Sequence, residues 1–476
     1  MNILSIDQGT SGTKAIVVDE SGTVLALAKV PVRPTYLQGG GVEQDPRALL
    51  DSVLVAGRRA VAEAGVAVDA VALANQGETV LAWDPTTGEP LTQAIVWQDS
   101  RSQEICDELA DSAELLAGRT GLVLDPYFSA PKMAWVRRHL TSGGVVTTTD
   151  AWLVHALTGE FAGDVTTASR SLLLDLDSLE WDQELLRLFG LQDERLPRLV
   201  ACDDIVGTTS AFGAEVPIAG LIVDQQSALL AEGCTDVGSA KCTFGTGAFL
   251  LVNTGSEAPR SANGLTTSAA WRTREGTQYC LDGQVYTAAS AVRWMSNVGL
   301  VSSSRAIDDM ASAHDDGVLF VPALAGLAAP WWRSDATASF TGLSLASTRG
   351  HLVRAVLEGI AAQVADLVSV MVQDVGGAVT SLRVDGGLTN STVLMQAQAD
   401  LLQVPIEVYP SAHATPLGAA ALARLALTPE ATLADSVPQW SPARVYESSW
   451  SPDRAADFLD RWRRAAAENL PEKGAS

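Results

Sequence analysis

The chain has 476 residues, with 32 Lys and Arg against 56 Asp and Glu, which gives a formal net charge of −24. A surface this anionic argues against a nucleic-acid partner. Apolar residues make up 47% of the chain and charged residues 18%, which excludes a disordered or fibrous protein. At roughly 150 residues per domain, we expect two or three domains.

The first predicted elements form a meander of strands around a glycine-rich loop. A strand at residues 3–6 leads into the loop DQGTSGTK at residues 7–14. Two more strands are expected at residues 15–19 and 23–30. This order differs from the strand, loop and helix of a Walker or Rossmann site, and the segment contains neither GxxxxGK[ST] nor GxGxxG.

Helices and strands alternate after the meander. Asp45 and Pro46 supply the N-cap and first residue of a helix that runs to about Gly65. Residues 68–74 predict a buried strand. Residues 242–252 form a second strand turn rich in glycine and hydroxyl groups, which resembles the first loop in composition. We interpret this resemblance as an internal duplication.

The last third of the chain predicts a long helix and a third glycine-rich turn. Apolar residues recur every three or four positions over residues 352–371, which predicts an amphipathic helix ending at Gly376. A strand at residues 381–384 runs into Asp385-Gly386-Gly387, and Asn390 is expected to cap the next helix. The pattern predicts two α/β domains with a seam near residue 230.

Other features predict the compartment and exclude a membrane span. Residues 1–7 contain no basic segment, so we expect no secretory signal. The charge-free stretch at residues 317–332 is shorter than the roughly 20 residues of a membrane helix. Five cysteines without a CxxC pair indicate reduced thiols, and no Cys/His cluster suggests zinc. The tail at residues 451–476 predicts a terminal helix with a frayed end.

The glycine-rich loops suit phosphate groups. Glycines let the backbone approach phosphate oxygens, while Ser and Thr hydroxyls and successive N–H groups donate hydrogen bonds to the anion. A single loop of this kind is as often an ordinary tight turn as a phosphate-binding loop. Three of them in one chain favour a cleft that grips a nucleoside triphosphate.

Several short segments, in a fixed order, carry a resemblance to one family. They are residues 7–10 (DQGT), 75–79 (NQGET), 97–101 (WQDSR), 126–129 (PYFS), 224–226 (DQQ), 244–247 (FGTG), 320–323 (FVPA), 385–387 (DGG), and a C-terminal signature from 340–343 (FTGL) to 356–358 (VLE). By these segments the chain resembles the FGGY family of carbohydrate kinases up to about residue 425, and within it the glycerol kinases.

The resemblance implies an α/β protein with the actin-like ATPase (ribonuclease H-like) fold. Two domains, expected at residues 1–232 and 233–476, would enclose a cleft that closes over ATP, Mg²⁺ and substrate. The implied activity is ATP-dependent phosphorylation of a hydroxyl on a small polyol or sugar. The net charge, the apolar stretches and the cysteines predict a cytoplasmic protein without nucleic-acid or membrane partners, and the resemblance allows a homodimer or homotetramer.

The family pattern assigns nucleotide and metal roles to residues of the three loops. Asp7 is expected to hold Mg²⁺ through water, since this hard cation takes oxygen ligands and keeps several waters. The expected phosphate contacts are Thr10, Ser11, Lys14 and Thr246, and the residues expected to face the nucleotide are Gly386, Gly387 and Asn390.

Asp224 corresponds to the catalytic base of the family, which accepts the proton of the attacking hydroxyl. On the residues alone, an Asp that follows the strand-like residues 220–223 is more commonly a helix N-cap. The Gln225 that follows in register favours the base.

The polyol pocket of the family corresponds to a set of polar and aromatic residues, in which polar groups bind hydroxyls and rings cover the carbon chain. The set is Gly77, Glu78, Trp97, Tyr127, Asp224, Gln225 and Phe249. For Trp97 and Phe249, plain core packing is the alternative role.

Two residues depart from the glycerol kinase pattern. Gly77 stands where these enzymes carry an Arg that hydrogen-bonds the substrate, a loss of roughly 1.5–3 kcal/mol or about ten- to a hundredfold in affinity. The vacated volume suggests a larger substrate, such as a tetritol or pentulose, with glycerol itself as the alternative. Val223 replaces the usual Gly before Asp224 and narrows the same pocket.

Two other functions compete with a kinase. One is an actin- or Hsp70-like ATPase without small-molecule phosphotransfer, since one fold hosts many functions. Glu78, Tyr127 and Gln225 have no evident purpose in such a protein. The other is an inactive sugar sensor, against which the presence of both Asp7 and Asp224 argues.

Overall fold

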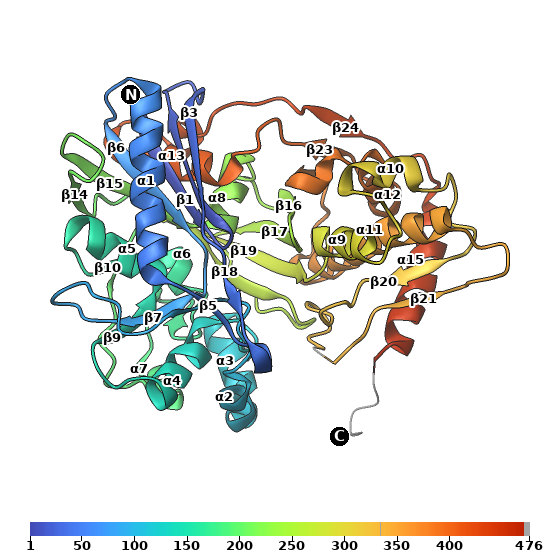
Figure 1. Ribbon diagram of the computed structural model, residues 1–476, viewed down its shortest axis with the longest axis horizontal. Helices are drawn as coiled ribbons and strands as arrows, with labels where there is room; N and C mark the ends of the chain where they lie inside the picture. The colour runs from blue at the N-terminus through green and yellow to red at the C-terminus, as the bar shows by residue number, and fades with distance from the viewer. Residues whose placement is uncertain (334, 471–476) are drawn as a thin grey trace.

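The computed structural model describes residues 1–333 and 335–470, whose two largest sheets are mixed and lie side by side (Figure 1). The first sheet has the order β14-β15-β6-β1-β2-β3, and the second has the order β18-β19-β17-β16-β22-β23-β24. The strands of the first sheet are β1 (Ile3–Gly9), β2 (Gly12–Val18), β3 (Val24–Pro31), β6 (Ala70–Asn75), β14 (Gly207–Thr209) and β15 (Val216–Val223). Those of the second are β16 (Ala240–Phe244), β17 (Ala248–Gly255), β18 (Thr266–Thr273), β19 (Gly276–Val285), β22 (Leu382–Asp385), β23 (Ile406–Val408) and β24 (Arg444–Tyr446). A smaller antiparallel sheet of five strands has the order β4-β5-β8-β7-β9, with β4 at Thr35–Tyr36, β5 at Val42–Gln44, β7 at Val80–Trp83, β8 at Ala94–Ile95 and β9 at Val145–Thr148.

The two sheets repeat one topology. Each contains an antiparallel hairpin, β1–β2 or β16–β17, with a glycine-rich loop at its turn. The first strand of each hairpin also pairs in parallel with a later strand, β6 or β22, which pairs in parallel with β15 or β23. The internal duplication predicted from composition is therefore confirmed at the level of topology.

Helices predicted from caps and periodicity occur where expected. Helix α1 (Pro46–Ala64) begins after Asp45, whose carboxylate accepts a hydrogen bond from the Arg47 N–H at 2.9 Å, and it ends at Gly65. Helix α11 (Arg349–Val375) ends at Gly376, which has a left-handed φ of 68°. The terminal helix is α15 (Pro452–Glu468); the end of the predicted frayed tail, residues 471–476, lies outside the described residues.

The predicted helix cap at Asn390 is wrong by one residue. Helix α12 spans Thr392–Leu402, and the Ser391 hydroxyl accepts a hydrogen bond from the Leu394 N–H at 3.1 Å. Asn390 instead ends the short turn η4 (Gly387–Asn390). Serine and asparagine are about equally good caps, so their order in the sequence did not decide between them.

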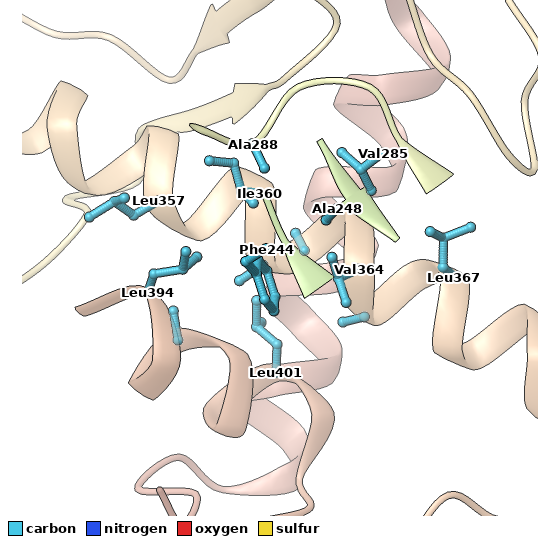
Figure 2. Packing of buried hydrophobic residues seen from close by; sticks show 14 of the residues in the cluster. Phe244, Ala248, Val285, Ala288, Leu357, Ile360, Val364, Leu367, Leu394 and Leu401 are labelled. Carbon is cyan, nitrogen blue, oxygen red and sulfur yellow. The ribbon is translucent and has the colours of Figure 1, made fainter. Parts of the chain in front are cut away.

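The core of the second half is built around α11. Leu357, Ile360, Val364 and Leu367 of this helix lie in one cluster with residues of the sheet and of α12, among them Phe244 (Figure 2). Helix α11 has the length and composition to cross a membrane, but 83% of its most apolar window is buried inside the molecule. Its apolar surface is therefore used in this core.

Two helices lie between the sheets and join the halves. Helix α8 (Asp224–Ala231) follows β15, and α13 (Ala414–Leu427) returns from the second half to pack on the first sheet (Figure 1). Alternate strand residues point to opposite faces, so Ile3 packs with α8 and α13 while Leu4 faces α1. Trp271 of the second sheet joins the same cluster as α8. The start of α8 is thus fixed by both halves.

The contact between α8 and α13 depends on Gly418, where an added Cβ would lie 1.9 Å from the Ser227 carbonyl oxygen. We expect Gly418→Ala to lower the free energy of unfolding by about 1–3 kcal/mol through overpacking, although this exchange within a helix otherwise stabilises. The matched control is Gly118→Ala in α3 (Ala113–Thr120), where an added Cβ meets nothing within 4 Å. Equal denaturation midpoints for the two variants in urea would contradict the close packing.

Candidate active site

A cavity of about 730 Å³ lies between the two halves, a volume in the usual range for small-molecule sites. Both glycine-rich loops line it. The lining includes these residues predicted from the sequence: Thr10, Ser11, Gly77, Glu78, Trp97, Tyr127, Asp224, Gln225, Thr246 and Phe249. Residues from distant parts of the sequence thus meet at one place.

The other predicted residues lie outside this lining. Asp7 and Lys14 face each other across β1 and β2, with Nζ 3.2 Å from Oδ2. Gly386 has a φ of 95°, and an added Cβ would lie 2.4 Å from the Phe244 carbonyl oxygen, so its turn packs directly on the end of β16. Gly387 and Asn390 are exposed beside it, joined by a hydrogen bond from Asn390 Nδ2 to the Gly387 carbonyl.

Asp224 is the first residue of α8 and does not cap it. The N-cap position belongs to Val223, and the helix start has no side-chain cap, so the alternative role of Asp224 as an N-cap is wrong. Burial raises the pKa of Asp224 to about 7, aided by the charges of Asp7 and Glu78 and opposed by Lys241. This carboxyl group therefore exchanges its proton near neutral pH.

Lys241 fixes the orientation of Gln225. Its buried Nζ donates hydrogen bonds to Gln225 Oε1 at 2.7 Å and to Thr243 Oγ1 at 2.8 Å. Because lysine is only a donor, the amide oxygen must point to it, which leaves Nε2 of Gln225 as the donor for a ligand.

A buried charge cluster lies beside Glu78. Its carboxylate pairs with Arg170 Nε, and Arg170 Nη1 lies 3.2 Å from Asp282 Oδ2. All three side chains are buried. Burial raises the pKa of Glu78, while the ion pair with Arg170 opposes this effect. Glu78 also has a left-handed φ of 59°, a strained conformation of the kind that concentrates at functional sites.

Three aromatic rings form one wall of the cavity. The Trp97 ring meets those of Tyr127 and Phe249 edge-on, at centroid distances of 5.6 and 6.2 Å. Trp97 Nε1 also donates a hydrogen bond to Thr10 Oγ1 at 2.9 Å, which ties this wall to the first loop. Trp97 and Phe249 are only partly buried and line the cavity, so they are wall residues rather than plain core.

The two departures from the family pattern face each other. A Cβ added at Gly77 would lie 3.0 Å from Val223 Cγ2 and 3.9 Å from Arg170 Cδ. The Val223 methyl therefore takes up the space that a side chain at position 77 would need, and the pocket does not widen at Gly77 itself.

Several charged residues of the site were not predicted from the sequence, namely Lys241, Arg170, Asp282 and Arg293. The first three are buried, and Arg293, on α9 (Ala289–Asn297), lines the cavity near the second loop. A charged residue inside an apolar strand, as in AKCTF at residues 240–244, is the signal that points to such positions.

Comparison with known proteins gives consistent results along the chain. The model of the FGGY family of carbohydrate kinases, N-terminal domain, matches residues 2–231, and that of the C-terminal domain matches residues 240–427. A glycerol kinase of Leptothrix cholodnii is 41% identical, covering 98% of this chain and 99% of that protein. The crystal structure of Plasmodium falciparum glycerol kinase with ADP superposes with a TM-score of 0.92 at 33% identity, covering 99% of this chain and 98% of that one. A xyloylose kinase from Brucella ovis superposes with a TM-score of 0.89 at 27% identity, covering 98% and 99% of the two chains.

The raised pKa of Asp224 makes stability depend on pH. The folded state binds this proton more tightly than the unfolded state, whose carboxyl has a pKa near 3.8, so the stability contributed by the proton is full below 3.8 and is lost as pH rises from there to about 7. We expect Asp224→Asn, which carries no charge, to have a higher Tm than the wild type at pH 8.5 and a much smaller difference in Tm at pH 4.5. Calorimetric scans at both pH values measure the difference. A lower Tm for the variant at pH 8.5 would contradict the claim that the ionised Asp224 carboxylate destabilises the folded state.

Proposed function

The chain belongs to the FGGY family of carbohydrate kinases, and on that premise we propose that it transfers the γ-phosphate of ATP to a hydroxyl of a polyol or ketose with four or five carbons, with Asp224 as the general base. Its kinase activity on an alcohol acceptor and its two-domain actin-like ATPase fold follow from the family and from the structural neighbours. The observation that carries the proposal is an aspartate with a pKa near 7 that faces a cavity shared by two phosphate-type loops.

The proposed reaction begins with the acceptor hydroxyl against the Asp224 carboxylate. The ionised carboxylate takes the hydroxyl proton as the oxygen attacks the γ-phosphorus, and ADP leaves. Gln225 Nε2 donates to a substrate oxygen, and Glu78 accepts from a hydroxyl. The rings of Trp97 and Phe249 cover the carbon chain and exclude water. These groups orient the acceptor, which supplies much of the rate enhancement.

The proposed phosphate site combines the two hairpin loops. Thr10 and Ser11 line one side of the cavity and Thr246 the other, so hydroxyl and backbone N–H groups reach a bound anion from both halves.

Among residues 1–333 and 335–470, no group of three His, Cys, Asp or Glu can hold a metal ion. A single carboxylate, Asp7, fits Mg²⁺ that keeps its waters and the ATP phosphates as ligands. When bound, Mg²⁺ would neutralise charge on the transferred phosphoryl group.

Glycerol is the second candidate substrate. The sequence relative named above and one of the two structural neighbours are glycerol kinases, which favours it. Gly77 argues for a different preference, because the guanidinium expected there is missing. An actin-like ATPase without phosphotransfer has no support from the family to which the chain belongs.

The remaining parts of the proposal concern the organisation of the protein. We place the domain boundary at residues 232/233, just after α8 and before the first strand of the second hairpin, β16. All five cysteines are free and buried, as suits a reducing cytoplasm. A homodimer or homotetramer is proposed from the family alone.

Asp224→Asn is expected to lower kcat/KM for the best acceptor by about 10²–10⁴-fold, the usual contribution of a general base. The measurement is ADP release in a coupled assay with glycerol, erythritol, xylitol, xylulose, ribulose and dihydroxyacetone. For the wild type, kcat/KM should rise with pH and level off above about 7. Turnover by the variant at the wild-type rate would eliminate Asp224 as the base.

Lys241→Met should affect both binding and the acid limb of the pH profile. Loss of the hydrogen bond to Gln225 frees the amide, so we expect KM for the acceptor to rise about tenfold. Because Lys241 lowers the pKa of Asp224, its removal should move the acid limb of kcat/KM to higher pH. Lys241→Arg keeps the charge and serves as the control; a pH profile that does not move in Lys241→Met would contradict the electrostatic role.

A further inference from the structure

A second, much smaller chamber of about 20 Å³ lies directly behind the cavity. The two share part of their walls, made of Glu78, Tyr127, Asp224, Gln225 and Phe249. The chamber's own walls are Arg170, Val223, Gln226, Leu251 and Asp282. Since a water molecule needs about 10–15 Å³, the chamber admits one group of that size and not two.

The chamber contains a buried acceptor without a partner. Gln226 is 1% exposed, and its Nε2 donates to Ser268 Oγ at 3.1 Å. Its Oε1 has no hydrogen-bond partner within the part of the chain that the structure describes. Buried polar atoms are normally paired, and leaving one unpaired costs about 1–3 kcal/mol. A group that brings an O–H into the chamber satisfies this atom.

Arg170, a second wall residue, supplies donors close to Gln226, since its Nη1 lies 3.5 Å from the same Ser268 Oγ that Gln226 Nε2 contacts. Arg170 carries five N–H groups and no acceptor. Its Nε and Nη1 bind Glu78 and Asp282, which fix the guanidinium in place and balance its charge. A chamber lined by an unpaired acceptor and a fixed guanidinium matches a hydroxyl, which both donates and accepts. An ammonium would meet the like charge of Arg170, and a carboxylate would meet those of Glu78 and Asp282.

The remaining walls are apolar and fit carbon. Val223 and Leu251 line the chamber, and Val223 also occupies the space beside Gly77. A longer acceptor therefore gains no room at position 77. The space open to a longer acceptor is instead the small chamber, which the cavity meets at Glu78 and Tyr127.

We propose that this inner chamber is the subsite for the distal hydroxyl of a polyol or ketose with at least four carbons, recognised by Gln226 and Arg170. The inference rests on the proposed function, since it uses Asp224 as the point of attack. Asp224 lines both spaces, so the reacting hydroxyl lies in the cavity while the far end of the carbon chain reaches inward. A three-carbon acceptor leaves the chamber to water.

The test is the ratio of kcat/KM for erythritol to kcat/KM for glycerol, measured by coupled ADP release. Gln226→Met removes the acceptor at nearly constant volume, and Val223→Ile fills the chamber with one more methylene. Each is expected to lower the ratio about tenfold, and the wild type should favour erythritol. Gln398→Met on α12 is the matched control, because Gln398 is equally buried with an unpartnered Oε1 but lies outside both linings, and it should leave the ratio unchanged.

Three outcomes would overturn the subsite. The first is a wild type with a higher kcat/KM for glycerol than for every longer acceptor. The second is a fall of equal size for both substrates in Gln226→Met, which would assign the chamber to a structural water. The third is an unchanged ratio in both chamber variants. In each case ADP release with some polyol continues, so the proposed phosphotransfer with Asp224 as base survives, although the first outcome also refutes the preference for four or five carbons. Absence of acceptor-dependent ADP release throughout would refute both the subsite and the kinase.

Discussion

The chemistry proposed here depends on one electrostatic constraint: the carboxylate of Asp224 lies partly buried at the wall of the cavity, beside two others, Asp7 and Glu78. Burial and like charge together raise its affinity for a proton, and the buried Lys241 sets a limit to that rise. A carboxyl with its ordinary pKa near 3.8 would be a weak base at neutral pH, whereas one near 7 is matched to accept a proton from a hydroxyl. The same arrangement makes the ionised site a cost to folding.

The packing of two helices between the sheets, α8 and α13, holds Asp224 in this unfavourable environment. Helix α8 cannot shift away from the cavity, because α13 contacts it at Gly418 and contacts β15 at Gly220, where an added Cβ would lie 2.4 Å from the Ala419 carbonyl oxygen. The Ser5 hydroxyl donates to the Pro416 carbonyl at 2.6 Å and anchors α13 to the first sheet. A segment from the second half of the sequence thereby holds the proposed base of the first half.

The sequence predicted those features of the fold that depend on neighbouring residues alone, such as turns and helix ends. Hydroxyl- and glycine-rich turns predicted both loops, and the cap at Asp45 and the glycine at Gly376 predicted the ends of two helices. It did not reveal partnerships between distant residues. Arg170 and Glu78 are 92 positions apart, and nothing local marks them as a pair. The sequence placed Gly77 and Val223 at the same pocket, but it did not reveal that the Val223 methyl occupies the space of a side chain at position 77. That contact changes the conclusion drawn from the missing side chain.

The most direct test of the account is a crystal structure with a non-hydrolysable ATP analogue, Mg²⁺ and the acceptor with the highest kcat/KM. We predict that an Asp224 carboxylate oxygen lies about 2.6–3.2 Å from one acceptor hydroxyl, in line with the γ-phosphorus, with Thr10 and Thr246 at the phosphates. A complex in which Asp224 faces no hydroxyl of the acceptor, or in which the nucleotide phosphates lie away from the two hairpin loops, would contradict it.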